Sequence, residues 1–100
     1  MNLKRESSTK FIDDYGNEKW LDKFGRIHRI DGPAYISVHG TYAWFFKGLR
    51  HRIGGPAIIT NEDFSWWNMG KFYPSKEDYW DSLSDKEKEE CLISEDFFKY

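Results

Sequence analysis

Two histidines stand at the same position of a recurring pattern and are the first candidates for chemistry. His28 and His51 are separated by 23 residues, and His28 lies three residues before Asp31, a spacing compatible with an acid–base pair. The second copy has no acid at the matching position, and neither histidine has a serine or cysteine nucleophile beside it. We therefore expect both rings to be structural, each bonded to a backbone carbonyl of the neighbouring unit.

Other groups that could do chemistry are also poorly placed for it. A zinc site needs three or four ligands in tetrahedral geometry, but Cys91 is the only cysteine and no Cys-x-x-Cys or His-x-x-x-His pair exists. The paired acids at 13–14 and 62–63 fall where turns are expected, so we interpret them as solvated. No phosphate-binding glycine motif is present. We expect no catalysis, no metal and no cofactor.

The pattern that contains the histidines is an internal repeat. Residues 25–36 and 48–59 both read G-x-x-H-R-I-x-G-P-A-x-I, and a third, partial copy begins at Trp66. Positions with an expected structural role in the repeat are Trp20, Gly25, His28, Gly32, Pro33, Trp44, Gly48, His51, Gly55, Pro56, Trp66 and Gly70.

Each unit has the signals of a β-hairpin. Residues 34–38 alternate with a period of two, His39-Gly40 is a turn signal, and residues 41–46 form a second β-rich run before Lys47-Gly48. Gly-Pro then interrupts the pairing, because proline cannot donate a hydrogen bond. The sequence predicts an α+β fold: an antiparallel β-meander of two full and one partial repeat of ~23 residues, capped by short C-terminal helices.

This fold class divides the single domain into three segments. Residues 1–15 form a polar N-terminal segment with frayed residues 1–10, residues 16–74 the repeat sheet, and residues 75–100 the helical cap. Ser75 and Ser84 each have the spacing of a helix N-cap, and they predict one to three helices. The cap either covers the last sheet unit, with Cys91 in its core, or offers Phe97, Phe98 and Tyr100 as an exposed aromatic anchor.

Composition and charge narrow the classes of function. Aromatic residues make up 19% of the chain, and their repeat positions indicate that most of these rings replace an aliphatic core. The net charge is −2, but residues 74–100 carry nine acidic and four basic side chains, whereas residues 1–73 carry eight and 11. The sequence has neither an apolar run long enough to span a membrane nor a secretory signal. Its one cysteine excludes an internal disulfide and fits a reducing compartment.

The repeat also resembles a known family. The pattern W-x-x-x-G-x-x-H-R-x-x-G-P-A is similar to the MORN-like short β-repeat proteins of bacteriophages and large DNA viruses, and the resemblance covers residues 16–74. The second copy departs from it with Gly54 in place of an acid, and the third copy lacks the HR and GPA letters. The resemblance implies a β-repeat scaffold without catalysis and a viral origin, with the cytoplasm of an infected bacterium as its location.

Two functions remain open from these observations. The first is a protein–protein interaction module, a small phage-encoded inhibitor that blocks a host defence protein, toxin or nuclease complex by covering it. The alternative is binding of RNA or single-stranded nucleic acid by the basic, aromatic face of the sheet. Neither reading involves a membrane, and both leave the oligomeric state open. The residues expected to make contact are Arg26, Arg29, Arg50, Arg52, Phe97, Phe98 and Tyr100.

Overall fold

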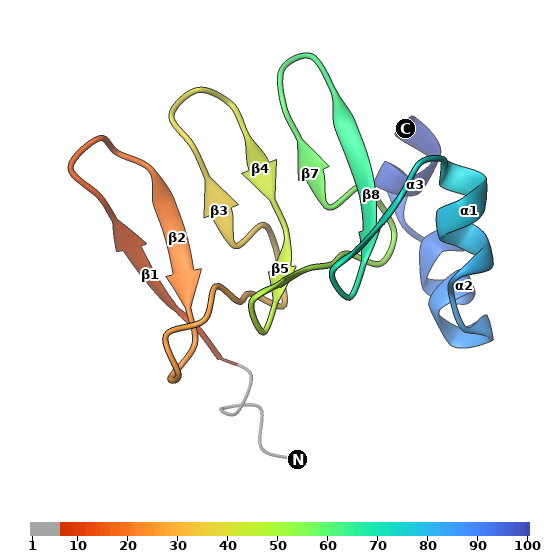
Figure 1. The fold of residues 1–100 in the computed structure, drawn as a ribbon, viewed down its shortest axis with the longest axis horizontal. Coiled ribbons are helices and arrows are strands. Elements are labelled where there is room, and N and C mark those ends of the chain that lie inside the picture. Colours follow the sequence, from red (N-terminus) through yellow and green to blue (C-terminus); the bar gives the residue numbers. More distant parts are fainter. Residues whose placement is uncertain (1–6) are drawn as a thin grey trace.

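The computed structural model describes residues 7–100, which form an antiparallel sheet with helices at one end (Figure 1). A seven-stranded sheet has the order β1-β2-β3-β4-β7-β8-β9, and β5 and β6 form a separate two-stranded sheet. The strands are β1 (Thr9–Ile12), β2 (Glu18–Leu21), β3 (Tyr35–Ile36), β4 (Tyr42–Ala43), β5 (Phe45–Phe46), β6 (Leu49–Arg50), β7 (Ile58–Ile59), β8 (Phe64–Asn68) and β9 (Lys71–Tyr73). The predicted α+β meander with a helical cap is confirmed.

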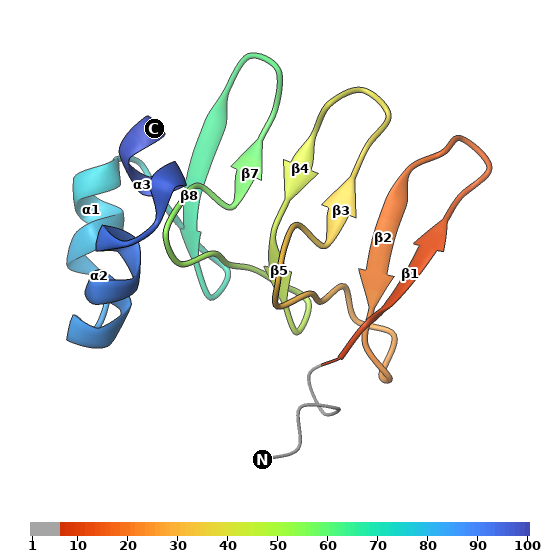
Figure 2. The same cartoon turned by 180° about the vertical axis from the view of Figure 1, so that it is seen from behind.

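Three hairpins lie side by side, formed by β1–β2, β3–β4 and β7–β8 (Figures 1 and 2). At their opposite end the chain reverses in tighter turns. The turn from β5 to β6 has φ of 49° at Lys47 and 83° at Gly48, and the turn from β8 to β9 has 48° at Met69 and 84° at Gly70. Two successive positive φ values characterise the hairpin turn whose twist matches that of the strands.

The sheet begins earlier than the sequence predicts. Residues 9–12 were expected to belong to the polar N-terminal segment, frayed up to residue 10, but they form β1 and pair with β2 in four register positions. Phe11 and Ile12 favour a strand, and β2 would otherwise leave its backbone groups unpaired. The connecting turn is fixed by Asp13, whose carboxylate accepts hydrogen bonds from the backbone N–H groups of Tyr15 and Asn17. The expected fraying of residues 1–6 lies outside the described residues.

The cap consists of α1 (Lys76–Asp81), α2 (Asp85–Leu92) and α3 (Glu95–Lys99). Ser75 caps α1 as predicted, and Ser84 forms a reciprocal capping box with Glu87 at the start of α2. The helices enclose a cluster that joins Trp66 of β8 to Tyr79 and Cys91, both fully buried. The predicted burial of Cys91 is confirmed, and the cap and the last sheet unit share one core. None of the helices among residues 7–100 is long and apolar enough to cross a membrane.

Candidate functional site

Two arginines of the repeat stack on tryptophans instead of extending into solvent. The guanidinium carbon of Arg29 lies 4.0 Å from the ring centroid of Trp20, and that of Arg52 lies 3.8 Å from Trp44. Each arginine also donates to the carbonyl of the proline four residues later, Pro33 and Pro56, at 3.1 Å. The side chain of Arg52 is only 12% exposed. These contacts make the two arginines part of the scaffold.

The two stacked arginines obtain their acidic partners from different places. Arg29 pairs with Asp31 of its own loop, with 2.9 Å between Nε and Oδ1. Gly54 stands at the matching position of the second unit, and Arg52 pairs instead with Asp96 of α3. Guanidinium groups lower the pKa of both carboxyls, through hydrogen bonds and through their charge. The cap therefore supplies the acid that the second repeat lacks.

The other two arginines that were expected to make contact lie near the turns at the end of the sheet opposite the three hairpin loops. Arg26 is bonded to Asp22, which is 8% exposed. Arg50 lies over the ring of Trp67, 4.9 Å from its centroid. Three of the four arginines proposed from the sequence as a basic stripe thus form ion pairs among the described residues, which reduces the positive charge they offer to a partner.

Both repeat histidines bond to the backbone of a neighbouring turn, but these hydrogen bonds differ from the expectation. The Nδ1 atom of His28 accepts a hydrogen bond from the N–H of Lys47, and that of His51 accepts one from the N–H of Met69, both at 2.9 Å. The expected carbonyl partner is wrong for these contacts, because the donors are N–H groups of tight turns in which φ is positive. Burial lowers the pKa of His51, against an opposing effect of Glu87, and favours the neutral ring that can accept.

The thiol of Cys91 and the side chain of Tyr79 are buried in the core. Burial raises the pKa of the Cys91 thiol and of the Tyr79 hydroxyl, so both stay protonated at neutral pH. The acids at 13–14 and 62–63 lie in exposed turns, as expected. Within residues 7–100, no group of three or more His, Cys, Asp or Glu side chains is arranged to hold a metal ion.

The C-terminal aromatics divide between core and surface. Phe97 is 7% exposed and packs against Trp66, so the expectation that it belongs to an exposed aromatic anchor is wrong. Its position on a five-residue helix places it toward the sheet, whereas Phe98 points outward and is 64% exposed. Tyr100 is partly exposed and lies 4.9 Å from the ring of Phe64.

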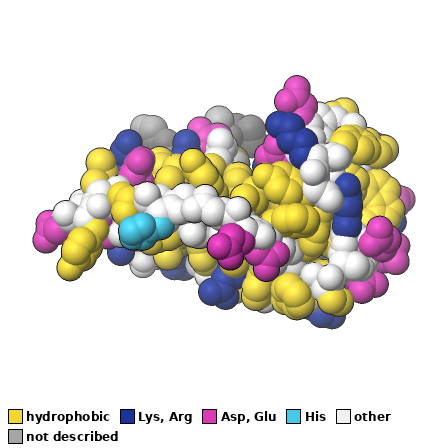
Figure 3. Space-filling view, turned by 90° about the horizontal axis from the view of Figure 1, so that it is seen from above, with side chains coloured by type: hydrophobic (Ala, Val, Ile, Leu, Met, Phe, Trp, Pro, Cys, Tyr) yellow, Lys and Arg dark blue, Asp and Glu magenta, His cyan; other side chains and the backbone are white. Residues whose placement is uncertain are grey.

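Tyr100 and Phe64 form the end of an apolar row that crosses the sheet. Residues paired directly across antiparallel strands share one face. The row comprises Ile12, Ile36, Tyr42, Ile59 and Phe64, with Glu18 interposed between Ile12 and Ile36, and it ends at Tyr100. Ile12, Tyr42 and Phe64 are at least 42% exposed. Seen from above, hydrophobic side chains extend from the hairpins to the helical end (Figure 3).

Sequence reasoning missed this row, although a signal for it is present. Apart from Ile12, the row residues stand two positions from the repeat tryptophans or alanines, for example Tyr42 before Trp44 and Ile36 after Ala34. Strand side chains alternate between faces, so this spacing places them on the same face as the tryptophans. Their exposure could not be inferred, because it depends on how far the helical cap extends over the sheet.

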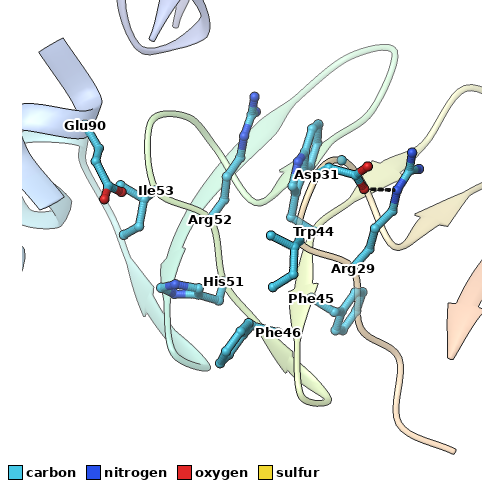
Figure 4. Close-up of a pocket in the computed structure, with 11 residues that line it drawn as sticks. Arg29, Asp31, Trp44, Phe45, Phe46, His51, Arg52, Ile53 and Glu90 are labelled. Carbon is cyan, nitrogen blue, oxygen red and sulfur yellow. Dashed lines mark hydrogen bonds and ion pairs between the residues drawn. The ribbon is translucent and has the colours of Figure 1, made fainter. Parts of the chain in front are cut away.

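A cavity of about 570 Å³ opens between the loops of the first and second units. Arg29 and Asp31 lie on one side, joined by their ion pair, and Ile53 and Glu90 lie on the other (Figure 4). The remaining residues lining the cavity include Ile30, Gly32, Trp44, Phe45, Phe46, His51 and Arg52.

Comparison of the chain with protein-family models, curated proteins and solved structures found no match. The MORN-like resemblance therefore stays a prediction from the sequence, and function must be argued from the geometry.

Proposed function

We propose that this protein is a non-catalytic protein-binding module whose contact surface is the apolar row, and that it inhibits a host protein by covering a functional surface. The supporting observation is the row itself, which crosses six neighbouring strands with apolar side chains on five of them and Glu18 on β2, and which Tyr100 of the cap continues. Ile12, Tyr42 and Phe64 are its exposed members. Five strand spacings correspond to about 24 Å, a suitable length for an interface that buries roughly 800 Å² on each partner.

The charge of the cap indicates which partners fit. Residues 74–100 have a balance of −5, and their helices lie beside the end of the row formed by Phe64 and Tyr100. Acidic side chains around an apolar centre favour a partner with a basic rim, and they accelerate its association at low salt. Nucleases and other nucleic-acid-binding host proteins carry such basic surfaces, so they form the target class of this proposal.

The proposal is tested by using the protein to capture its partner from a host lysate and by comparing the wild type with two matched variants. Ile12→Glu/Tyr42→Glu places charges in the row, whereas Phe24→Glu/Ile93→Glu places the same charges at exposed apolar positions outside it. We expect one stoichiometric protein with the wild type and with the control, and at least a tenfold loss with the row variant. Inhibition is then measured on the purified target.

Two outcomes would contradict the proposal. Equal capture by the row variant and the wild type would show that the row is not the contact surface. Co-purification of RNA or DNA that salt releases, without a stoichiometric protein, would support the nucleic-acid alternative instead.

A further inference from the structure

Because the units repeat, the cavity between the first and second units has an equivalent between the second and third units. The helical cap fills this second position. A shift of 23 residues relates the loop 29–32 to the loop 52–55, and Trp44 occupies in its unit the position that Trp66 occupies in the third. Loop 29–32 and Trp44 form the walls of the open cavity. Loop 52–55 and Trp66 form the corresponding walls of the second site, which α1 and α3 cover. The covered site shows which chemistry such walls accept.

A tyrosine is the central group in the covered site. The ring of Tyr79 lies 4.9 Å from that of Trp66, and its hydroxyl donates to the carbonyl of Arg52 and accepts from the N–H of Gly54. Ile53, between these two loop residues, packs against the same cluster. The walls thus accept a phenol, with an aromatic ring against the tryptophan and a hydroxyl on the loop backbone.

The open cavity presents the same elements without an occupant from the chain. Ile30, which matches Ile53, is 57% exposed and lines the cavity. The carbonyl of Arg29, which matches that of Arg52, accepts no hydrogen bond within residues 7–100. Arg52 also lines the cavity, where its guanidinium is stacked on the indole of Trp44.

The two sites differ in where the acid that pairs with their arginine comes from, and this determines whether an occupant must bring a carboxylate. The covered site needs Asp96, because Gly54 leaves Arg52 without an acid and also gives Ser94 room to approach. The open cavity has its own acid in Asp31, paired with Arg29, and Glu90 at the opposite side. An occupant of the cavity therefore needs an aromatic ring and a hydroxyl but no carboxylate.

From this correspondence, we propose that the cavity between Arg29–Gly32 and Trp44 binds the phenolic side chain of a tyrosine presented by a protein partner. Its volume lies within the range of about 300–1,000 Å³ that is typical of ligand pockets. The source of the tyrosine rests on the proposed protein-binding function, whereas the affinity of the cavity for a phenol can be measured on the protein alone.

Titration of the full ¹⁵N-labelled chain with 4-methylphenol tests the inference. We expect NMR shift changes at the indole N–H of Trp44 and the amides of Ile30 and Asp31, with an affinity on the order of millimolar. 4-Methylanisole keeps the ring and the oxygen but cannot donate a hydrogen bond, so we expect it to bind about fivefold more weakly.

Matched variants identify the site. Ile30→Trp fills the cavity and should abolish the shifts, whereas Ile93→Trp adds the same ring at a position that is 86% exposed and should leave them unchanged. Equal affinity for the two probes, shifts that persist in Ile30→Trp, or shifts centred on residues outside the cavity would overturn the assignment.

The outcomes separate this inference from the proposed function. Binding of 4-methylphenol as expected, with no host protein captured by the wild type, contradicts the function and leaves the cavity assignment intact. Capture of a protein without 4-methylphenol binding contradicts the cavity assignment alone.

Discussion

Gly55 lies where the guanidinium of Arg52 passes on its way to Trp44. A Cβ atom at this position would stand 2.5 Å from Nη1 and 2.6 Å from Cζ of that arginine. Gly32 faces Arg29 in the same way in the first unit, with 2.9 Å to Cζ. The glycine of the Gly-Pro-Ala pattern is therefore explained by the space that a stacked arginine requires.

A double-mutant comparison tests this explanation. We expect Gly55→Ala to reduce the free energy of unfolding by about 1–3 kcal/mol, because Arg52 must leave Trp44. In an Arg52→Ala background the same substitution meets no guanidinium, so it should be neutral or stabilise by up to about 1 kcal/mol. Urea unfolding measures both changes, and an equal loss in the two backgrounds would refute the steric explanation.

His51 gives a second prediction at this scale, one that depends on pH. Its pKa in the folded protein lies below the ordinary value of 6.5, because burial disfavours the charged ring. Above pH 6.5 the ring is neutral in both states and its stabilising contribution is complete. As the pH falls through and below 6.5 the unfolded state binds the proton first, and that contribution is lost.

His51→Asn isolates this effect, because asparagine offers an acceptor in place of Nδ1 but does not titrate. We expect the wild type to be the more stable protein at pH 7.5 and its advantage in urea unfolding to narrow by pH 5. An advantage that is the same at both pH values would contradict the prediction.

Residue types and their spacing predicted some of these residue contacts but not all of them. The register of Trp, His, Gly and Pro was evident from the sequence, and the structural role of His28 and His51 follows from it. The partners of the rings were not predictable, because the N–H groups of Lys47 and Met69 are available only in a turn with positive φ. The burial of Arg52 was missed as well, since an arginine in a pattern does not reveal what covers it.

At the scale of elements, the contact of α1 with the second unit includes the hydroxyl of Tyr79. Tyr79→Phe removes a donor to Arg52 and an acceptor for Gly54 while it keeps the buried ring. We expect a loss of about 1–3 kcal/mol in urea unfolding, because a buried backbone group loses its partner. Tyr42→Phe, at a half-exposed ring, should change stability by less than about 0.5 kcal/mol, and an equal effect of the two substitutions would contradict this role of Tyr79.

The helices themselves were predictable from Ser75 and Ser84, because capping is a local property. Their docking was not, since Arg52 and Asp96 are 44 residues apart and nothing in the repeat marks the acid as a replacement. The strand at residues 9–12 was missed for a related reason: its main support is pairing with β2 and not a repeated motif.

For the molecule as a whole, the two ends of the sheet differ in their cover. Every residue of β1 is exposed, and within residues 7–100 this strand pairs on one side only. At the other end, β8 contributes Trp66 to the core beneath the helices. In a stack where each unit contacts mainly its neighbours, such a difference gives a gradient of local stability.

Hydrogen exchange measured by NMR checks this gradient. We expect the backbone N–H groups of Thr9 and Phe11, which face β2, to exchange at least tenfold faster than those of Trp44 and Ala57, which donate to Ala57 and Ser65 in the interior of the sheet. Equal protection at the two ends would mean that the sheet opens as one cooperative unit.

The replacement of Asp31 by Gly54 links the second unit to the cap. The first unit has an acid in its own loop, which pairs with its arginine. The second unit has glycine there and receives an acid and a tyrosine hydroxyl from the cap. Extra copies of the first type could be inserted ahead of the second, each lengthening the molecule by about 10 Å, without any change in how the chain is terminated.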